Sequence, residues 1–500
     1  MQHSEAHLTR LSSRAHLIHR LTSVVLLLAV ALAVFSAAAH AQEPISLHPD
    51  NPHYFLWRGE PTILITSAEH YGAVLNRDFD YVKYLDTLAA DGLNNTRTFT
   101  GGAYVEPDGA FRIARNTLAP AGGRFIAPWA RSDEPGYAGG GNKFDLSKWD
   151  EAYFQRFRDF VAQAGRRGIV VEVNLFCPMY ADVQWSLSPM NVRNNFNGLG
   201  DLAERNDLYT LEKHGGLLEV QERMVRKFVE ELREFDNIYY EIMNEPYIRN
   251  VSKDWEHHIA DVIVDAQKEH PNKKLISQNI ANKTAKVENP HPAISIFNFH
   301  YTTPPTAVTD NYHLDKVIGD NETGFRGTAD LPYRTEAWDF LIAGGGLFNH
   351  LDYSFTVGHE DGTFDYPETQ PGGGNAGFRR QMAILREFLY GFDFIRMKPD
   401  DGIIRGGVPR SASALALVEP GRAAAVYLHW PIDDGKAQKG SVDGPLSVEL
   451  AEGSYAAKWL DPVSGETVRE EEFRHDGGQR RLEIPDFDED VALAIKRQDE

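Results

Sequence analysis

The chain alternates short apolar runs with amphipathic stretches from about Ser46 to Lys398. Repetition of an apolar run followed by a stretch with helical spacing predicts strand–helix units and a parallel sheet. Eight runs predict strands: Thr62–Thr66, Asn94–Phe99, Ile169–Leu175, Ile238–Met243, Lys274–Gln278, Ile294–Phe299, Val317–Asp320 and Leu347–Tyr353. Eight strands with intervening helices predict a closed (β/α)8 TIM barrel, of the α/β class, over residues 42–398.

The pattern changes after about Pro399, where short alternating runs are separated by turn residues. The runs are Ala414–Val418, Ala423–Trp430, Leu446–Leu450, Tyr455–Leu460, Val468–Phe473, Leu482–Ile484 and Val491–Ile495. Short strands at regular spacing predict a small all-β sandwich over residues 399–500. We expect this segment to be an accessory domain.

The first residues have the features of a targeting segment. Three arginines precede an apolar run from Val24 to Ala39, which ends in Ala-His-Ala. This pattern predicts a signal peptide over residues 1–41 that is cleaved before Gln42, and hence a periplasmic or secreted protein. An uncleaved membrane anchor is the alternative, because the run is nearly long enough to span a bilayer. No later segment is apolar enough to do so.

Charge and cysteine content narrow the range of partners. The net charge is −21, and loss of three arginines and one glutamate with the signal peptide makes the mature chain more acidic. Such a surface repels nucleic acid and anionic membranes, whereas it does not disfavour a neutral glycan. The single cysteine, Cys177, excludes an intrachain disulfide. Without a Cys/His motif around it, a buried packing role is favoured over a nucleophile.

Two connections are far longer than usual, Thr100–Lys143 and Pro178 to about Glu212. Both follow strand carboxyl ends, the face on which barrel enzymes build their sites. They are rich in aromatic and amide side chains, which suit the C–H faces and hydroxyls of sugars. We therefore expect Trp185 to contact substrate, with ordinary loop packing as the alternative.

Glycosidic bonds are cleaved by two carboxyl groups, so two acids must reach one end of the barrel. The fourth strand ends in Asn244-Glu245-Pro246, where the proline should stop the strand and hold Glu245 in extended geometry. Asn244 can hydrogen-bond a sugar hydroxyl. The segment resembles the acid/base strand of clan A glycoside hydrolases, which include the cellulase- and mannanase-type family 5 enzymes. In that clan Asn-Glu closes strand four, as it does here.

The second acid should close strand seven. The run from Val317 is followed by Glu322 and then a glycine, and it resembles the nucleophile segment of the clan. Asp320 and Glu336 are the competing acids. Asp320 lies two residues before Glu322, with its side chain on the same face if the strand is regular, and Glu336 lies at the start of an expected helix.

Further residues are placed by the same resemblance. Arg97 matches the strand-two arginine that orients the nucleophile and keeps it ionised, although an ordinary ion pair at the rim would look the same. His70 follows strand one and either binds substrate hydroxyls or has a structural role. His300 and Tyr301 end strand six, where relatives have His-x-Tyr. Because the two are adjacent here, strand alternation would send them to opposite sides.

Strand eight lacks the tryptophan that lies under the sugar in the clan, so Tyr353 or His350 would replace it. The segment Trp459–Pro462, followed by Ser464-Gly465-Glu466, resembles the collagen-binding-type β domain that follows bacterial barrel hydrolases. We do not predict collagen binding from it.

The resemblance implies a retaining glycoside hydrolase that acts on an oligo- or polysaccharide by double displacement. Glu322 would attack the anomeric carbon, and Glu245, with its pKa raised by burial and the neighbouring carboxylate, would be the acid/base. We expect no cofactor and no metal, since two-carboxylate chemistry needs neither. A transglycosylase with the same residues and a non-catalytic glycan-binding or adhesion protein are the alternatives. The sugar, the linkage and endo or exo action depend on the two long loops.

Overall fold

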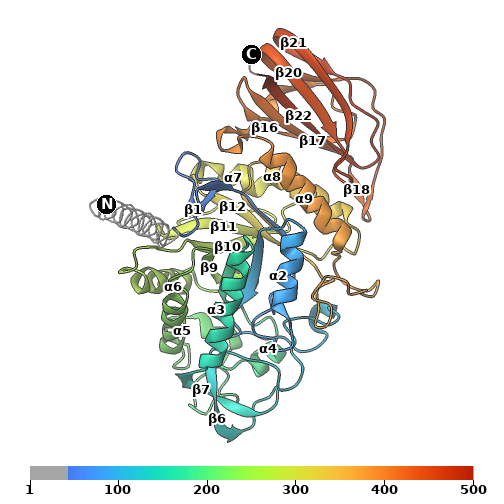
Figure 1. Ribbon diagram of the computed structural model, residues 1–500. Helices are drawn as coiled ribbons and strands as arrows, with labels where there is room; N and C mark the ends of the chain where they lie inside the picture. The colour runs from blue at the N-terminus through green and yellow to red at the C-terminus, as the bar shows by residue number, and fades with distance from the viewer. Residues whose placement is uncertain (1–42, 499–500) are drawn as a thin grey trace, which may run out of the picture. The chain divides into compact units, whose positions relative to one another are not determined.

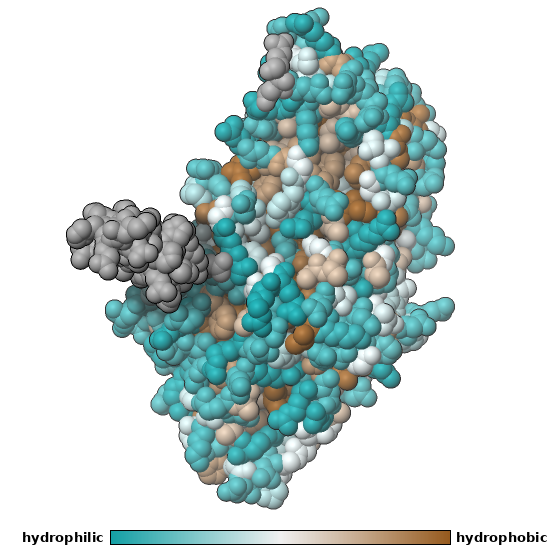
Figure 2. All heavy atoms as spheres, viewed as in Figure 1, coloured by the Kyte–Doolittle hydropathy of each residue, from teal (hydrophilic) through white to brown (hydrophobic). Residues whose placement is uncertain are grey.

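The structure is a computed structural model that describes residues 43–498, and the chain from Pro44 onward forms one compact unit. The predicted signal peptide and its cleavage site before Gln42 lie outside the described residues. Within residues 43–498, no helix has the length and apolar character needed to cross a membrane. The viewed face of the molecule is mostly hydrophilic, with apolar residues scattered over it (Figure 2).

Eight parallel strands form the central sheet in the order β4-β13-β12-β11-β10-β9-β8-β5 (Figure 1). The strands are β4 (Leu64–Ala68), β5 (Asn95–Phe99), β8 (Val170–Phe176), β9 (Ile238–Met243), β10 (Ile276–Asn282), β11 (Ile294–His300), β12 (Val317–Thr323) and β13 (Leu347–Leu351). The two ends of this order, β4 and β5, are joined by Asn94, which directly precedes β5. Its side chain accepts a hydrogen bond from Ile65 N of β4 (2.8 Å) and donates one to the neighbouring Ile63 O (2.8 Å). The predicted (β/α)8 barrel is confirmed.

Helices follow most of the barrel strands, as the repeating pattern predicts, although the connection from β10 to β11, which lies within the described residues, contains no helix. They are α2 (Tyr81–Ala90), α3 (Glu151–Arg166), α4 (Asp182–Leu187), α5 (Leu218–Glu231), α6 (Lys253–Ala266), α7 (Thr306–Asn311), α8 (Leu331–Ile342) and α9 (Ala376–Tyr390). In α3, the N-cap Asp150 accepts from two backbone amides, and the buried residues recur at helical spacing. The helix therefore has one apolar face, which packs on the barrel.

A small antiparallel sheet lies at the amino-terminal end of the barrel strands. It consists of β1 (Ser46–Leu47), β2 (Phe55–Trp57) and β3 (Glu60–Thr62). Phe55 and Trp57 share a buried cluster with the first residues of barrel strands, including Leu64 and Val317. The segment near Thr62 thus ends this small sheet, and the first barrel strand begins two residues later than predicted.

The two long connections carry structure of their own. The first contains the 3-10 turn η1 (Ala110–Arg112) and the hairpin β6 (Trp129–Pro135) and β7 (Asn142–Trp149). The second contains α4 and the 3-10 helix η2 (Arg205–Tyr209). Both follow the carboxyl ends of barrel strands, so they surround the face on which we expect the site.

The C-terminal segment is an all-β domain, as predicted. Its strands are β14 (Lys398–Pro399), β15 (Ile404–Gly406), β16 (Ser413–Glu419), β17 (Ala423–His429), β18 (Ile432–Asp433), β19 (Lys436–Ala437), β20 (Leu446–Leu460), β21 (Thr467–Leu482) and β22 (Asp490–Gln498), with the 3-10 turn η6 (Asp401–Ile403) among them. Except for the β18–β19 pair, they are hydrogen-bonded in one antiparallel sheet, which encloses a second apolar core around Trp430 and Trp459.

The barrel and the β domain meet at α8, every residue of which is buried. Trp338 of α8 stacks on Tyr427 of β17, with ring centroids 5.1 Å apart. Arg334 of α8 pairs with Asp490 of β22 through two hydrogen bonds of 2.8 and 3.0 Å. Figure 1 shows α8 and α9 beside the C-terminal strands. The β domain therefore covers one side of the barrel.

Candidate active site

Glu245 and Glu322 lie together at the carboxyl end of the barrel. Glu245 directly follows Asn244 at the end of β9, and Glu322 is the last residue but one of β12. His300 lies between them, with Nδ1 3.3 Å from Glu245 Oε1 and 3.6 Å from Glu322 Oε1. One atom from each of the three side chains lies within 4.8 Å of the other two. The two acids singled out in the sequence are thus close neighbours.

A β-bulge in β12 turns Glu322 toward the site. Phe299 of β11 pairs with Asp320, but the next residue, His300, pairs with Glu322, so Asn321 is the extra residue. A bulge breaks the alternation of side chains. Asp320 consequently points out of the barrel toward α8, while Glu322 faces the site.

The two competing acids do not reach the site. Asp320 is fully buried outside the barrel, where burial and the neighbouring Glu336 raise the pKa of its carboxyl. Glu336 lies in α8 and accepts from Thr323 Oγ1 (2.9 Å) and Arg326 Nη1 (3.1 Å). Burial also raises the pKa of Glu336. These two acids form a separate cluster behind β12.

Three donors hold the carboxyl of Glu322, and His300 lies beside it. Tyr71 donates to Oε2 (2.9 Å), Tyr301 donates to Oε1 (2.6 Å), and Arg97 Nη1 lies 3.3 Å from Oε2. His300 is the fourth neighbour. Arg97 is fully buried and also pairs with two other carboxyls, those of Glu172 and Glu241. Arg97 thus lies beside Glu322, as the sequence predicted, but inside the barrel rather than at its rim.

The interior below Glu322 is polar. Burial, followed by the charge of Glu241, raises the pKa of Glu172 to about 8, so this carboxyl is protonated at neutral pH. Asn321 Nδ2 donates to both Glu172 (2.8 Å) and Glu241 (2.8 Å). Arg97 therefore contacts three carboxyls, of which Glu172 carries no charge at neutral pH.

Glu245 has its own set of neighbours. Tyr180 from the second long connection donates to Oε2 (2.5 Å), and Tyr247 donates to Oε1 (3.3 Å). Burial raises the pKa of Glu245, but His300, Tyr180 and the charge of Arg97 outweigh burial, so the pKa lies below its ordinary value. We expected a raised pKa. The expectation was wrong because it counted the neighbouring carboxylate and not the donors.

Three residues at the site have left-handed backbone conformations: Tyr71 (φ 63°), Glu245 (φ 42°) and Tyr301 (φ 56°). Such conformations are strained for residues other than glycine and cluster at functional sites. The value for Glu245 corrects our expectation that Pro246 would keep it extended. The bend at Tyr301 explains how both His300 and Tyr301 reach the carboxylates although they are adjacent in the sequence.

The other predicted residues differ in their positions. Asn244 accepts from Arg97 Nη2 (2.8 Å) and donates to the Tyr180 hydroxyl (2.8 Å), so its amide already has protein partners. His70 lines the cavity described below. Tyr353 is buried behind the cavity wall, with its ring 5.9 Å from that of His70. Trp185 lies in α4, packs against the core and does not line the cavity.

His350 does not replace the missing tryptophan of strand eight. Its ring packs between Tyr333 (4.4 Å) and Phe378 (4.6 Å), outside the barrel, and burial lowers its pKa to about 3. Sequence reasoning missed Tyr71, Glu172 and Glu241. Tyr71 and Glu241 each lie within one to four residues of a predicted site residue, and this proximity in the sequence could have indicated them.

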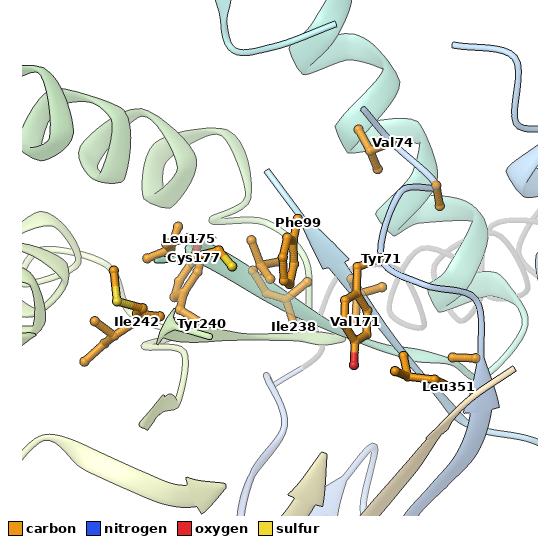
Figure 3. Close-up of a cluster of buried hydrophobic side chains, with 14 of the residues drawn as sticks. Tyr71, Val74, Phe99, Val171, Leu175, Cys177, Ile238, Tyr240, Ile242 and Leu351 are labelled. Atoms are coloured by element: carbon orange, nitrogen blue, oxygen red, sulfur yellow. The ribbon is translucent and has the colours of Figure 1, made fainter. Parts of the chain in front are cut away.

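The carboxylates open into a cavity of about 270 Å³. Its lining is largely aromatic, and comprises His70, Tyr71, Phe99, Tyr104, Glu106, Phe111, Leu118, Cys177, Tyr180, Asn244, Glu245, Asn282, Tyr301, Glu322 and Phe325. Tyr71 and Phe99 stack at 4.9 Å, and Figure 3 shows them beside buried side chains of the barrel strands. Cys177 is buried, as predicted.

Glu245, His300 and Glu322 also have the spacing of metal ligands. The oxygens of Glu322, however, already accept from two tyrosines, and the Arg97 cation lies beside them. These donors occupy lone pairs that a metal ion would need. The two tyrosine hydroxyls and the guanidinium of Arg97 are hydrogen-bond donors. They therefore suit the Glu322 carboxylate itself better than they suit a site for a metal ion.

Fold and site together define a (β/α)8-barrel protein with paired carboxylates in a pocket at the carboxyl ends of its strands. Searches against protein-family models and curated proteins give no match. One similar solved structure, described as a glycoside hydrolase, has a TM-score of 0.61 at 15% identity and covers 91% of this chain and 97% of its own.

A glycoside hydrolase family 5 structure from Bacteroides vulgatus has a TM-score of 0.60 at 14% identity and covers 91% of this chain and 93% of its own. The matched 91% of this chain is longer than the barrel segment, so these matches include C-terminal β strands. The fold of the chain is thus that of family 5-type glycoside hydrolases.

Proposed function

We propose that the protein is a retaining glycoside hydrolase, with Glu322 as nucleophile and Glu245 as acid/base. The observation that carries the proposal is the pairing of the two carboxyls, which have oxygens within 4.8 Å at the ends of strands four and seven. Retaining enzymes keep their carboxyls about 5–5.5 Å apart, whereas inverting enzymes need about 6.5 Å or more to admit a water molecule. The short separation supports double displacement.

In the first step, Glu322 attacks the anomeric carbon, and the leaving oxygen takes a proton from Glu245. Arg97 and the hydroxyls of Tyr71 and Tyr301 fix the direction of the Glu322 carboxylate. Donors held in place before the reaction cost no reorganisation during it. In the second step, Glu245 removes a proton from water, which releases the sugar with retained configuration.

The first step needs protonated Glu245, yet its pKa lies below the ordinary value in the free protein. General-acid catalysis then operates best on the acidic side of neutrality. In the second step the same carboxylate acts as a base, for which the ionised form is the starting state. The environment of Glu245 therefore favours deglycosylation at neutral pH and glycosylation at acidic pH.

The nucleophile is tested with Glu322→Ala on a panel of aryl glycosides. Loss of the nucleophile should lower kcat by at least about 10⁴-fold, as for other catalytic residues that act as a unit. Azide should restore part of the turnover and give a glycosyl azide of inverted configuration, because the small anion occupies the space of the carboxylate. The exposed Glu387→Ala on α9 serves as the control. Full turnover by Glu322→Ala would contradict the assignment of Glu322 as the nucleophile.

Transglycosylation uses the same residues and differs only in the acceptor that attacks the intermediate. Product analysis with and without an added sugar acceptor distinguishes the two reactions. A glycan-binding protein without turnover would instead bind sugars and leave every aryl glycoside intact. We also propose that the protein is exported after cleavage before Gln42, and that residues 42–398 and 399–500 are its two domains.

A further inference from the structure

One wall of the cavity consists of a chain of buried polar groups that the proposed reaction does not use. Tyr104 donates to Glu106 Oε1 (2.8 Å), and Asn116 Nδ2 donates to Glu106 Oε2. Asn116 Oδ1 in turn contacts His70 Nδ1 (3.1 Å). Three of these four, Tyr104, Glu106 and His70, line the cavity. Neither Glu106 nor His70 hydrogen-bonds Glu245 or Glu322.

The wall is held rigidly by the loop after β4. Glu69 accepts from Gly72 N (3.0 Å), Ala73 N (2.9 Å) and Thr117 Oγ1 (2.6 Å), which ties the long connection to this loop. The backbones approach so closely that a Cβ atom on Gly72 would lie 2.2 Å from the carbonyl of Thr117. Glu106 N donates to Leu118 O (2.9 Å). This side of the cavity is therefore closed.

The proton positions follow from the contacts. Asn116 Oδ1 also accepts from Leu118 N (2.9 Å), so the amide oxygen faces His70 and the imidazole hydrogen is on Nδ1. Burial lowers the pKa of His70 to about 4, so the ring is neutral and Nε2 is an acceptor. Glu106 has no basic partner among the described residues, and burial raises its pKa to about 7. The wall thus offers acceptors to a ligand.

We propose that this cavity is a blind pocket for a single terminal sugar ring, whose hydroxyls Glu106 and His70 bind. The inference rests on the proposed glycosidase function and makes the enzyme exo-acting on neutral sugars. A volume of about 270 Å³ lies below the 300–1,000 Å³ of pockets for drug-sized ligands, which leaves little room for more than one ring. A carboxylate retains free lone pairs after accepting two hydrogen bonds, so Glu106 can also accept sugar hydroxyls.

Above about pH 7, the same carboxyl disfavours acidic sugars. With a pKa of about 7, Glu106 is ionised above that pH, and a uronic acid would then bring its carboxylate near a like charge in a buried site, which repels strongly. Phe111 and Phe325, which are 42% and 41% exposed, lie at the open side of the cavity with ring centroids 6.4 Å apart. The two rings are in edge-to-face contact, so they form the rim of the pocket on this side.

The experiment compares wild type, Glu106→Ala, Glu106→Gln and the control Glu387→Ala. Turnover is measured on 4-nitrophenyl glycosides of glucose, mannose, galactose, xylose and glucuronic acid. Binding of the corresponding free sugars is measured by saturation-transfer NMR. Loss of the hydrogen bonds between Glu106 and the sugar hydroxyls should reduce kcat/KM about 10- to 100-fold in Glu106→Ala, mainly through KM. Glu106→Gln, which keeps the shape and one acceptor, should lose less. Thermal unfolding shows that each variant is folded.

The outcomes separate the pocket from the reaction. If the wild type binds free sugars but cleaves no glycoside, and Glu106→Ala abolishes this binding, the sugar pocket is supported and the proposed glycosidase function is contradicted. If Glu106→Ala and the control Glu387→Ala retain turnover equally, the role of Glu106 in a sugar pocket is contradicted and the proposed glycosidase function is not. Release of mixed oligosaccharides from a polysaccharide, or cleavage of the glucuronide above pH 7 as efficiently as that of the glucoside, also overturns the pocket.

Discussion

The charge balance of the site depends on a few fully buried side chains. Arg97 contacts Glu172, Glu241 and Glu322, and the raised pKa of Glu172 keeps that carboxyl neutral. An ionised Glu172 would place a further negative charge beside this one guanidinium in a medium of low polarity. Protonation of Glu172 therefore leaves the Arg97 charge available to Glu322.

His300 is a positioning residue whose effect is visible in the pH profile. The general acid must be protonated, so kcat/KM falls as pH rises through the pKa of Glu245 in the free protein. His300 is one of the groups that lower this pKa, while burial raises it. We expect His300→Asn to move the alkaline limb of kcat/KM to higher pH.

The measurement is kcat/KM against pH for an alkyl glycoside, whose leaving group needs a proton. An aryl glycoside with a good leaving group is the internal control, because its cleavage depends much less on the acid. An unchanged alkaline limb in His300→Asn would show that His300 does not set the pKa of Glu245.

At this scale, the sequence predicted the residues whose positions follow from a motif at a strand end. Glu245, Glu322 and Arg97 were found in this way. The chain could not show that Tyr180, three residues past Cys177, reaches Glu245, because nothing local fixes the path of a long loop. The lowered pKa of Glu245 was likewise inaccessible, since it results from donors on three separate elements.

At the scale of elements, backbone irregularities decide which side chains face the site. Regular alternation in β12 would place Asp320 and Glu322 on one face, and the bulge at Asn321 separates them. The left-handed conformation of Tyr301 similarly brings two adjacent residues to one place. Apolar spacing predicted the strands and their order, but not these local departures, which depend on contacts with neighbouring strands.

The close approach at Gly72 makes a prediction about the pocket wall. A methyl group on Gly72 would collide with the backbone of Thr117 and push the wall away from β4. We expect Gly72→Ala to reduce the free energy of unfolding by about 1–3 kcal/mol, as overpacking commonly does, and to raise KM. Urea unfolding and steady-state kinetics measure the two effects.

Gly122→Ala is the matched control, because it lies on the same connection and a Cβ atom there would have no neighbour within 4 Å. If Gly72→Ala and Gly122→Ala had the same free energy of unfolding and the same KM, the wall would move at no cost in free energy. The pocket would then not be rigid.

At the scale of the whole molecule, the all-β segment is more than an appended module. Arg334 is buried at the junction, where it pairs with Asp490 and also bonds Glu489 (2.6 Å) and Gln381 (3.0 Å). The sequence predicted a change of fold near Pro399, but it gave no sign of this contact, since the partners are more than 150 residues apart.

Removal of Arg334 should loosen this junction. Arg334→Ala leaves Asp490, which is 5% exposed, without its cation, and such a loss typically costs about 3–5 kcal/mol. We expect a lower thermal unfolding temperature and faster proteolysis near residues 399–412. The exposed Arg410→Ala should leave both unchanged. Stability of Arg334→Ala equal to that of the control would contradict a structural role for the pair.

The burial of α8 on both sides has a consequence for the ancestry of the chain. A helix that packs on the barrel on one side and on the β strands on the other, where Trp338 stacks on Tyr427, cannot lose either neighbour without exposing apolar side chains. Recombination that exchanged one half for an unrelated segment would yield an aggregating product. The two halves are therefore expected to be inherited as a single block, and their histories should be traced with one tree.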